Sequence, residues 1–345
     1  DKIKITEKMD NLGVHYIEGG WPGSNPKDKE FFKQSKNKKL KNATLAAFGS
    51  TRRAKIKASE DTNLKDLVNS QAPTLTIFGK SWDLHVTDVI KTTLDENLAM
   101  IKESVAFLKS KKREVFYDAE HFFDGYKRNP QYALKTILAA QEGGADCLVL
   151  CDTNGGTLPD EVRRIINEIR DQVTVPLGIH VHNDLDLAVA NSITAIEMGC
   201  VQVQGTFNGL GERCGNADLC TIIGILHTKL KRPSIPDANV KKLMETSYFL
   251  SELSNIKLPD NHAFVGHSAF AHKGGVHIDA MIKNPLAYEH VDPELVGNRR
   301  RFVTSDLAGK MPIVLMAQKM DVQLDKRSPE AIKLLTNLQK KEKEG

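Results

Sequence analysis

The chain has 345 residues, of which 40% are hydrophobic and 27% charged, a composition typical of a globular protein. Its 48 basic and 44 acidic residues leave a net charge of only +4, which does not favour a nucleic-acid-binding protein. No run approaches the ~18–20 apolar residues that a bilayer span needs, which excludes a membrane-spanning protein. Five cysteines without a Cys-x-x-Cys pair argue against a disulfide framework and predict a reducing, cytoplasmic location.

Short apolar runs alternate with amphipathic helical patterns over residues 1–232. Strands that are apolar nearly throughout are typical of parallel sheets covered by helices. The absence of Gly-x-Gly-x-x-Gly after the first run disfavours a dinucleotide-binding open sheet, so we expect an α/β protein with a (β/α)8, or TIM, barrel. The predicted strands cover residues 15–19, 44–49, 74–79, 114–118, 147–151, 176–182 and 200–205.

Capping and breaking residues mark the starts of several helices. Thr93 and Glu96 have the spacing of a capping box. Asn129 and Pro130 begin another helix as cap and first turn, and Pro159 begins a third. These signals place helices between the predicted strands, as a barrel requires.

The domain organisation follows from where the alternation stops. Only seven strands precede residue 232, and a helical pattern comes first, so we expect a barrel over 1–232 whose first strand is missing before Asp1. Residues 233–345 predict a mostly helical accessory or linker region, with helices over 241–253 and 328–344.

His180 and His182 are the strongest chemical signal in the sequence. Alternate residues of a strand share one face, and at the C-terminal end of a barrel strand that face looks into the barrel mouth. Two imidazoles there can bind a divalent metal. The alternative is a pair of core histidines that bond to their neighbours, and the short motif alone leaves both interpretations open.

The glycine-rich segment 205–217 follows the next strand and permits positive φ and close backbone approach to a ligand. Asn216 in this segment can offer a carbonyl oxygen to the same metal, or it can instead cap the following helix. Cys214 has no evident histidine partner, so we interpret it as a small packing residue and not as a nucleophile.

Two further strand ends carry polar clusters, at residues 117–121 and 151–156. Their carboxylates, hydroxyl and amides suit an oxygen-rich substrate such as a keto acid. Each cluster could instead cap the helix that follows it.

Six motifs extend over nearly the whole chain: IEGGWPGSNPKD (17–28), DAEHFFDGYKRNP (118–130), CDTNGGTLP (151–159), HVHND with AVANS (180–192), GLGERCGNA (209–217) and SAFAHKGGVH (268–277). Together they resemble the metal-dependent acyl-CoA-condensing TIM barrels, a family that includes the isopropylmalate, homocitrate and citramalate synthases. The combination of DAEHFFDGY, DTNGG and AFAHKGGVH is most similar to the citramalate synthases.

The resemblance implies a Claisen condensation of acetyl-CoA with pyruvate, followed by thioester hydrolysis, in branched-chain amino-acid biosynthesis. It implies a divalent cation, Mg²⁺, Mn²⁺ or Zn²⁺, and acetyl-CoA as co-substrate. It also implies roles for seven residues: His180, His182 and Asn216 as metal ligands, Glu120 and His277 in proton transfer, Thr153 as a keto-acid contact, and Glu18 as a residue facing the pocket.

The resemblance also bears on assembly and on the ends of the chain. In the family, the region around His277 reaches the active site of a partner subunit, which implies a homodimer. The family begins with a strand that carries an Arg-Asp pair and ends with a regulatory domain, and we expect both to be missing from this sequence.

Other functions compete with this interpretation. An isopropylmalate or homocitrate synthase would use the same chemistry on another keto acid. A carbon–carbon lyase of a related barrel is also possible, but Glu212 and Arg213 in the glycine-rich loop favour a synthase. A non-catalytic barrel that serves as an interaction module would bind neither metal nor keto acid.

Overall fold

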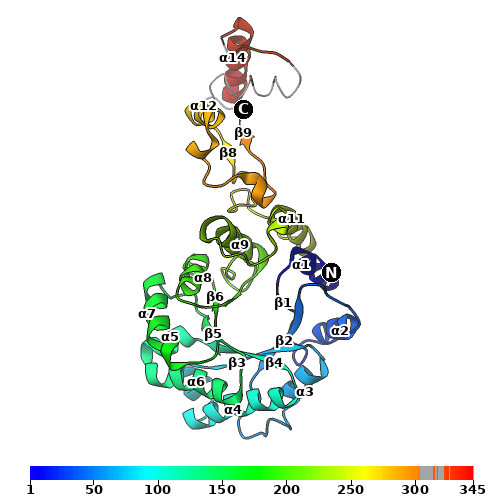
Figure 1. Ribbon diagram of the computed structural model, residues 1–345, viewed down its shortest axis with the longest axis vertical. Coiled ribbons are helices and arrows are strands. Elements are labelled where there is room, and N and C mark those ends of the chain that lie inside the picture. Colours follow the sequence, from blue (N-terminus) through cyan, green and yellow to red (C-terminus); the bar gives the residue numbers. More distant parts are fainter. Residues whose placement is uncertain (304–313, 315–316, 318–321, 326, 345) are drawn as a thin grey trace. The chain divides into compact units, whose positions relative to one another are not determined.

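The computed structural model describes residues 1–303, 314, 317, 322–325 and 327–344 (Figure 1). The chain divides into two compact units, Asp1–Ile223 and Gly224–Gly345. Among the described residues, each helix is too short or too polar to span a bilayer.

The first unit is built on one parallel sheet whose strands follow chain order from β1 to β7. All seven predicted strands are present, and their bounds differ from the predicted ones by at most two residues. This confirms the predicted TIM-barrel type of fold, with seven parallel strands in the described part of the chain. The strands are β1 Tyr16–Glu18, β2 Thr44–Ser50, β3 Thr74–Lys80, β4 Glu114–Glu120, β5 Cys147–Asp152, β6 Leu177–Val181 and β7 Gln202–Gln204.

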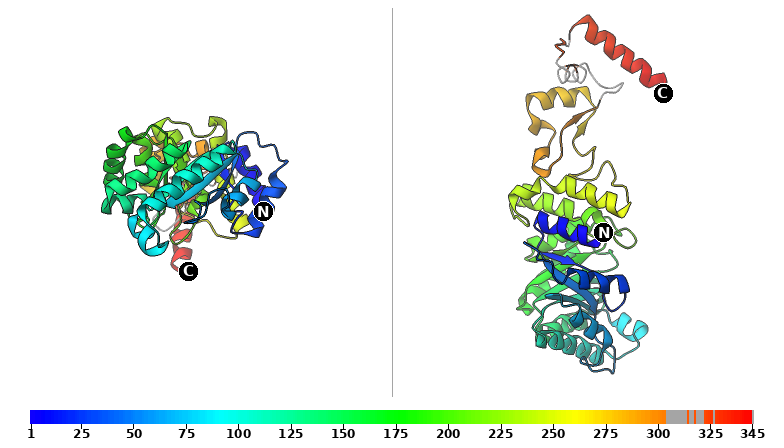
Figure 2. Two further views of the ribbon diagram at one scale, coloured as in Figure 1. Left: turned by 90° about the horizontal axis from the view of Figure 1, so that it is seen from below. Right: turned by 90° about the vertical axis from the view of Figure 1, so that its right-hand side faces the viewer.

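Helices cover the outer, convex face of this curved sheet, as the views in Figures 1 and 2 show. Helix α7 presents its apolar stripe to the sheet, and its buried side chains Val162, Ile165 and Ile166 are fully inaccessible. The helices are α1 Lys2–Leu12, α2 Pro26–Ser35, α3 Thr62–Asn69, α4 Leu94–Ser110, α5 Phe122–Arg128, α6 Pro130–Gly143, α7 Pro159–Ile169, α8 Ala188–Glu197 and α9 Leu219–Ile225.

The predicted helix starts at Thr93 and Asn129 are confirmed, although only half of the capping box forms. The Glu96 N–H donates to Thr93 Oγ1 at 3.1 Å. The Glu96 carboxylate accepts instead from Arg52 Nη1 at 2.8 Å and from the Lys55 N–H at 2.9 Å. The buried Arg52 guanidinium thus binds the Glu96 carboxylate that the sequence pattern places in the capping box.

Side chains alternate between the two faces of each strand, and this alternation determines which side chains point into the barrel interior. Leu75, Ile77 and Tyr117 lie on the face that the helices cover and are fully buried. On the opposite face of β4, Asp118 and Glu120 point into the interior, which is filled lower down by an apolar cluster of Phe116, Cys147, Val149 and Cys151. The carboxyl ends of the strands are therefore left for polar side chains.

The second unit contains the predicted helices over 241–253 and 328–344, which correspond to α11 Leu243–Ser254 and α14 Pro329–Glu344. It also contains α10 Asp237–Val240, α12 Gly275–Lys283 and a parallel pair of two-residue strands, β8 Ala271–His272 and β9 Arg301–Phe302. Strands of two residues carry no periodicity, so the sequence did not predict them. The π-helical turn η4 Leu226–Leu230 begins this unit.

Candidate active site

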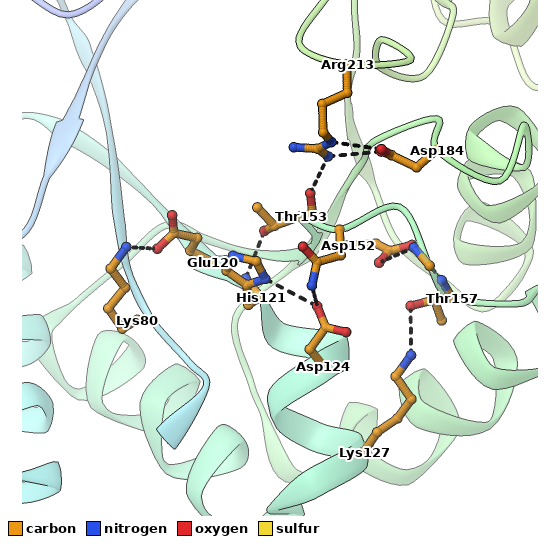
Figure 3. A network of polar contacts seen from close by, with 12 residues as sticks. Lys80, Glu120, His121, Asp124, Lys127, Asp152, Thr153, Thr157, Asp184 and Arg213 are labelled. Carbon is orange, nitrogen blue, oxygen red and sulfur yellow. Dashed lines mark hydrogen bonds and ion pairs between the residues drawn. The ribbon is translucent and has the colours of Figure 1, made fainter. Parts of the chain in front are cut away.

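Polar side chains from several strand ends face one another at the mouth of the barrel (Figure 3). Glu120 ends β4, Thr153 follows β5, and Asp184 and Arg213 come from the loops after β6 and β7. Parallel strands place their carboxyl ends at one edge, so residues distant in sequence meet there.

His180 and His182 lie next to each other at the end of β6. Their ring centroids are 5.1 Å apart in an edge-to-face arrangement. Burial and the neighbouring His182 lower the pKa of His180 to about 4, against a hydrogen bond to Gln204 that raises it. Burial and Arg213 also lower the pKa of His182. Both imidazoles are therefore neutral near neutral pH, which is the form that binds metal.

Asn216 is held opposite His182 by an isolated antiparallel bridge. The Asn183 N–H donates to the carbonyl of Gly215 at 2.9 Å beside this bridge. A Cβ at Gly211 would lie only 3.0–3.1 Å from the Asn216 amide group, so the glycine leaves the space that this side chain fills. Loop 205–217 thus delivers the amide to the two histidines.

The alternative role of Asn216 as a helix cap is wrong. Helix α9 begins at Leu219, and the Asp218 carboxylate accepts from the N–H groups of Cys220 at 3.1 Å and Thr221 at 2.9 Å. Because Asp218 satisfies the first turn, the Asn216 side chain is available for another partner.

Three buried polar atoms at this point have no hydrogen-bond partner among the described residues: His180 Nδ1, His182 Nδ1 and Asn216 Oδ1. Buried polar groups in folded proteins are almost always paired, so three orphans side by side indicate a missing ligand. Nitrogen and carbonyl-oxygen donors fit a divalent cation. Among the described residues, no three His, Cys, Asp or Glu side chains are placed to hold a metal, so the set depends on the Asn216 amide.

Arg213 ties the surrounding loops together. Its guanidinium donates to Asp184 Oδ1 at 2.7 Å, to Asp184 Oδ2 at 2.9 Å and to the Thr153 carbonyl at 2.7 Å. The guanidinium lowers the pKa of Asp184, because a bidentate cation favours the ionised carboxylate. The ends of β5 and β6 are thereby fixed to the loop that carries Asn216.

Thr153 and Glu120 flank this cluster. The backbone N–H of His121 donates to Thr153 Oγ1 at 2.8 Å, so the hydroxyl proton remains free to donate to a substrate. Glu120 forms an ion pair with Lys80, the last residue of β3 (Figure 3). The His121 ring contacts Asp124, with Nδ1 and Oδ2 3.2 Å apart.

The polar cluster at 151–156 serves the loop as well as the site. The buried Asp152 carboxylate accepts from the N–H groups of Gly156 at 3.3 Å and Thr157 at 3.1 Å. Asp152 therefore fixes the loop backbone that carries Thr153, and Thr153 is the residue of this cluster that can contact a substrate.

Two carboxyl groups inside the barrel have raised pKa values. Burial and the nearby Asp118 raise the pKa of Glu18 to about 8, although water still reaches part of this side chain and moderates the shift. Burial raises the pKa of Asp118 to about 7; a hydrogen bond from Gln204 opposes the shift and the charge of Glu120 adds to it. Gln204 Nε2 donates to Asp118 Oδ1 at 2.9 Å.

His277 belongs to the second unit, where it is exposed on α12. Its ring stacks on Tyr288 with centroids 4.1 Å apart. The structure groups Glu120, Thr153, His180, His182 and Asn216 within the first unit; the role of His277 stays a prediction.

Several residues of the site were not assigned from the sequence. Asp118 could have been found, because it shares a strand face with Glu120. Lys80, Gln204 and Arg213 act through contacts distant in sequence, which the sequence alone does not reveal. Cys214 is exposed, so its interpretation as a packing residue is wrong.

Comparison with protein families decides which family the chain belongs to. The family model described as HMGL-like matches residues 1–250. The chain belongs to the HMGL-like family. A second model, described as homocitrate synthase post-HMGL domain-like, matches residues 264–343.

Curated relatives agree with this assignment. The (R)-citramalate synthase of Geobacter sulfurreducens is 54% identical over 345 residues, which cover 100% of this chain and 65% of the relative. The (R)-citramalate synthase of Aquifex aeolicus is also 54% identical, with 100% of this chain and 66% of the relative covered. The chain thus spans slightly less than two thirds of these relatives.

A solved structure shows the same fold. The HMG-CoA lyase of Bacillus subtilis superposes with a TM-score of 0.62 over 75% of this chain and 88% of that one. At 20% sequence identity, the likeness concerns the barrel fold alone.

Proposed function

We propose that this protein is an (R)-citramalate synthase that condenses acetyl-CoA with pyruvate and hydrolyses the product thioester to citramalate and CoA. One observation carries the proposal: two neutral histidines and an amide lie at the barrel mouth that Glu120 and Thr153 also face, and each has a buried atom without a partner in the part of the chain that the structure describes. The identity of 54% to two (R)-citramalate synthases supports the same substrates.

In this proposal His180, His182 and Asn216 hold a divalent cation, Mg²⁺, Mn²⁺ or Zn²⁺. When bound, the cation supplies Lewis-acid polarisation of the keto group. The Thr153 hydroxyl donates to the carboxylate of pyruvate, since its oxygen already accepts from the His121 N–H. Arg213 keeps Thr153 in place by binding its carbonyl.

Glu120 and His277 carry the proton transfers. A base removes a proton from the acetyl methyl group, and the methyl carbon forms a bond to the keto carbon of pyruvate. The new alkoxide takes up a proton. Water then cleaves the thioester, which yields a carboxylate and the CoA thiol. A positioned general base or acid commonly contributes ~10²–10⁴-fold to such steps.

The homodimer implied by the resemblance and the cytoplasmic location predicted from the cysteines belong to this proposal as well. Val276 and Leu286, close to His277 in sequence, are 78% and 79% exposed, and apolar side chains of this size favour a protein contact. Sedimentation of the full-length protein tests the dimer.

The deciding experiment measures thiol release from acetyl-CoA by the full-length protein with Mn²⁺. We expect release with pyruvate and much less with 2-oxoisovalerate or 2-oxoglutarate, and citramalate as the product. Preference for another keto acid would reassign the protein to an isopropylmalate or homocitrate synthase. A non-catalytic barrel would give no release and no thermal shift with Mn²⁺ or pyruvate.

A further inference from the structure

Lys80 and Glu120 form an ion pair at the inner edge of the sheet. The register of β3 and β4 places the two residues directly beside each other. Their side chains are only 17% and 22% exposed, so the pair is largely withdrawn from water. Figure 3 shows both side chains turned toward one another at the strand ends.

The backbone of each residue is anchored separately. Asn97 Nδ2 donates to the Lys80 carbonyl at 2.8 Å, and the Ser81 N–H donates to the Glu120 carbonyl at 3.1 Å. The Lys80 ammonium also lies 5.3 Å from the ring centroid of Phe78, a cation–π distance. Both partners are thus held before any substrate arrives.

Glu120 meets few other charges. The groups that interact with it electrostatically include Asp118 and Tyr117 on its own strand, Cys151 on β5 and His85 in the π-turn η1 His85–Val89. Burial, His121 and Lys80 lower the pKa of His85, which keeps that ring neutral. Lys80 is therefore the cation among these neighbours.

A largely buried ion pair is a poor device for stability, because the loss of hydration offsets much of the attraction. At the proposed reaction centre it has a clearer use. A general base must be ionised and aimed before it takes a proton.

We propose that Lys80 is a positioning residue for the condensation: its ammonium binds the Glu120 carboxylate and fixes its direction at the barrel mouth. This inference rests on the proposed function, in which Glu120 transfers protons. Lys80 does not need to touch the substrate.

The test compares Lys80→Met, Lys80→Arg and Lys102→Met in the full-length protein. Lys102 pairs with Glu142 at 2.9 Å on the exposed outer surface, so Lys102→Met removes an ion pair away from the barrel interior. The value of kcat, the KM for pyruvate and the melting temperature are measured for each. A loss of kcat at a nearly unchanged KM, partly restored by arginine, distinguishes a positioning role from a structural one.

We expect Lys80→Met to lower kcat about 10²-fold, with a smaller change in KM for pyruvate. Lys80→Arg should restore part of kcat, because its guanidinium can bind the same carboxylate, and Lys102→Met should match wild type. An unchanged kcat in Lys80→Met, or a loss of kcat that Lys80→Arg does not partly restore, overturns the inference.

Failure of the proposed function gives a different result. A wild-type protein that is inactive with every keto acid rejects the synthase but not the pairing. In that case a double-mutant cycle with Lys80→Met and Glu120→Gln, read out by urea unfolding, tests the pairing directly. Additive changes in the free energy of unfolding reject the pairing, and non-additive changes support it.

Discussion

Arg213 and Asp184 form a two-point ion pair that joins the loops after β7 and β6, with N···O distances of 2.7 and 2.9 Å. Asp184 follows His182 by two residues, and Arg213 precedes Asn216 by three. The pair therefore fixes the spacing between two of the proposed metal ligands.

Arg213→Met should loosen this spacing and weaken Mn²⁺ binding. Loss of a group that orients metal ligands commonly costs about 10–100-fold in metal affinity. Isothermal titration with Mn²⁺ measures the effect. Arg163→Met is the control, since Arg163 lies on the exposed face of α7 and is 3.7 Å from Glu197. Equal Mn²⁺ affinity in Arg213→Met and wild type would show that the pair does not support the ligands.

His180→Ala and His182→Ala should each remove Mn²⁺ binding while leaving the fold intact. Both side chains have a buried nitrogen without a partner among the described residues, so each substitution removes a proposed metal ligand without breaking a hydrogen bond of that atom. The thermal shift with Mn²⁺ and the circular dichroism spectrum report binding and fold separately. A full Mn²⁺ shift in either variant contradicts the metal site.

Gly155 and Gly156 are adjacent glycines with opposite expected tolerance. Gly155 has φ +63°, and a Cβ there would lie 2.6 Å from Asp184 Oδ2 and 2.8 Å from the Asp184 nitrogen. A Cβ at Gly156 meets nothing within 4 Å. Gly155→Ala should cost about 1–3 kcal/mol of unfolding free energy and weaken Mn²⁺ binding, whereas Gly156→Ala should do neither. Urea unfolding of both variants checks this, and equal stability would refute the steric argument.

The raised pKa of Asp118 predicts a pH-dependent stability. Its folded pKa is about 7, against about 3.9 for an unfolded aspartate. Between these values the folded chain keeps a proton that the unfolded chain has lost, so the free energy of unfolding falls as pH rises. Asp118→Asn keeps the acceptor for Gln204 and cannot ionise.

We therefore expect Asp118→Asn to lose less stability than wild type between about pH 5 and about pH 8, and to be the more stable protein at the upper end. Urea unfolding across this range measures the difference. Asp118→Asn also removes the charge that helps to raise the pKa of Glu18, so its effect through Glu18 has the same sign as its direct effect. Parallel stability curves would exclude Asp118 as the source.

The strands and most helices could be predicted because their signals are local. Asn129 before Pro130 fixes a helix start through its own side chain, which accepts from the Tyr132 N–H at 3.2 Å. The half-formed capping box at Thr93 shows the limit of this reasoning. Arg52 is distant in sequence from Glu96, and its hydrogen bond to the Glu96 carboxylate depends on tertiary structure.

The candidate site divides in the same way. His180 and His182 share a face by strand geometry alone, so their proximity could be inferred. The ion pair of Lys80 with Glu120 depends on the register of two strands that a long helix separates. The sequence of either strand alone does not determine that register. The bond from Arg213 to Asp184 depends on loop conformation.

The alternation of side chains along β4 makes the barrel mouth intolerant of a change in strand length. Inserting one residue before Asp118 would turn Asp118 and Glu120 toward the helices and bring Ala119 to the inner face. The two carboxylates would then pack against apolar side chains of the helices, and the barrel interior would lose both acidic groups. Insertions and deletions in this family should therefore collect in the connecting loops, and natural variants should conserve the number of residues in β4.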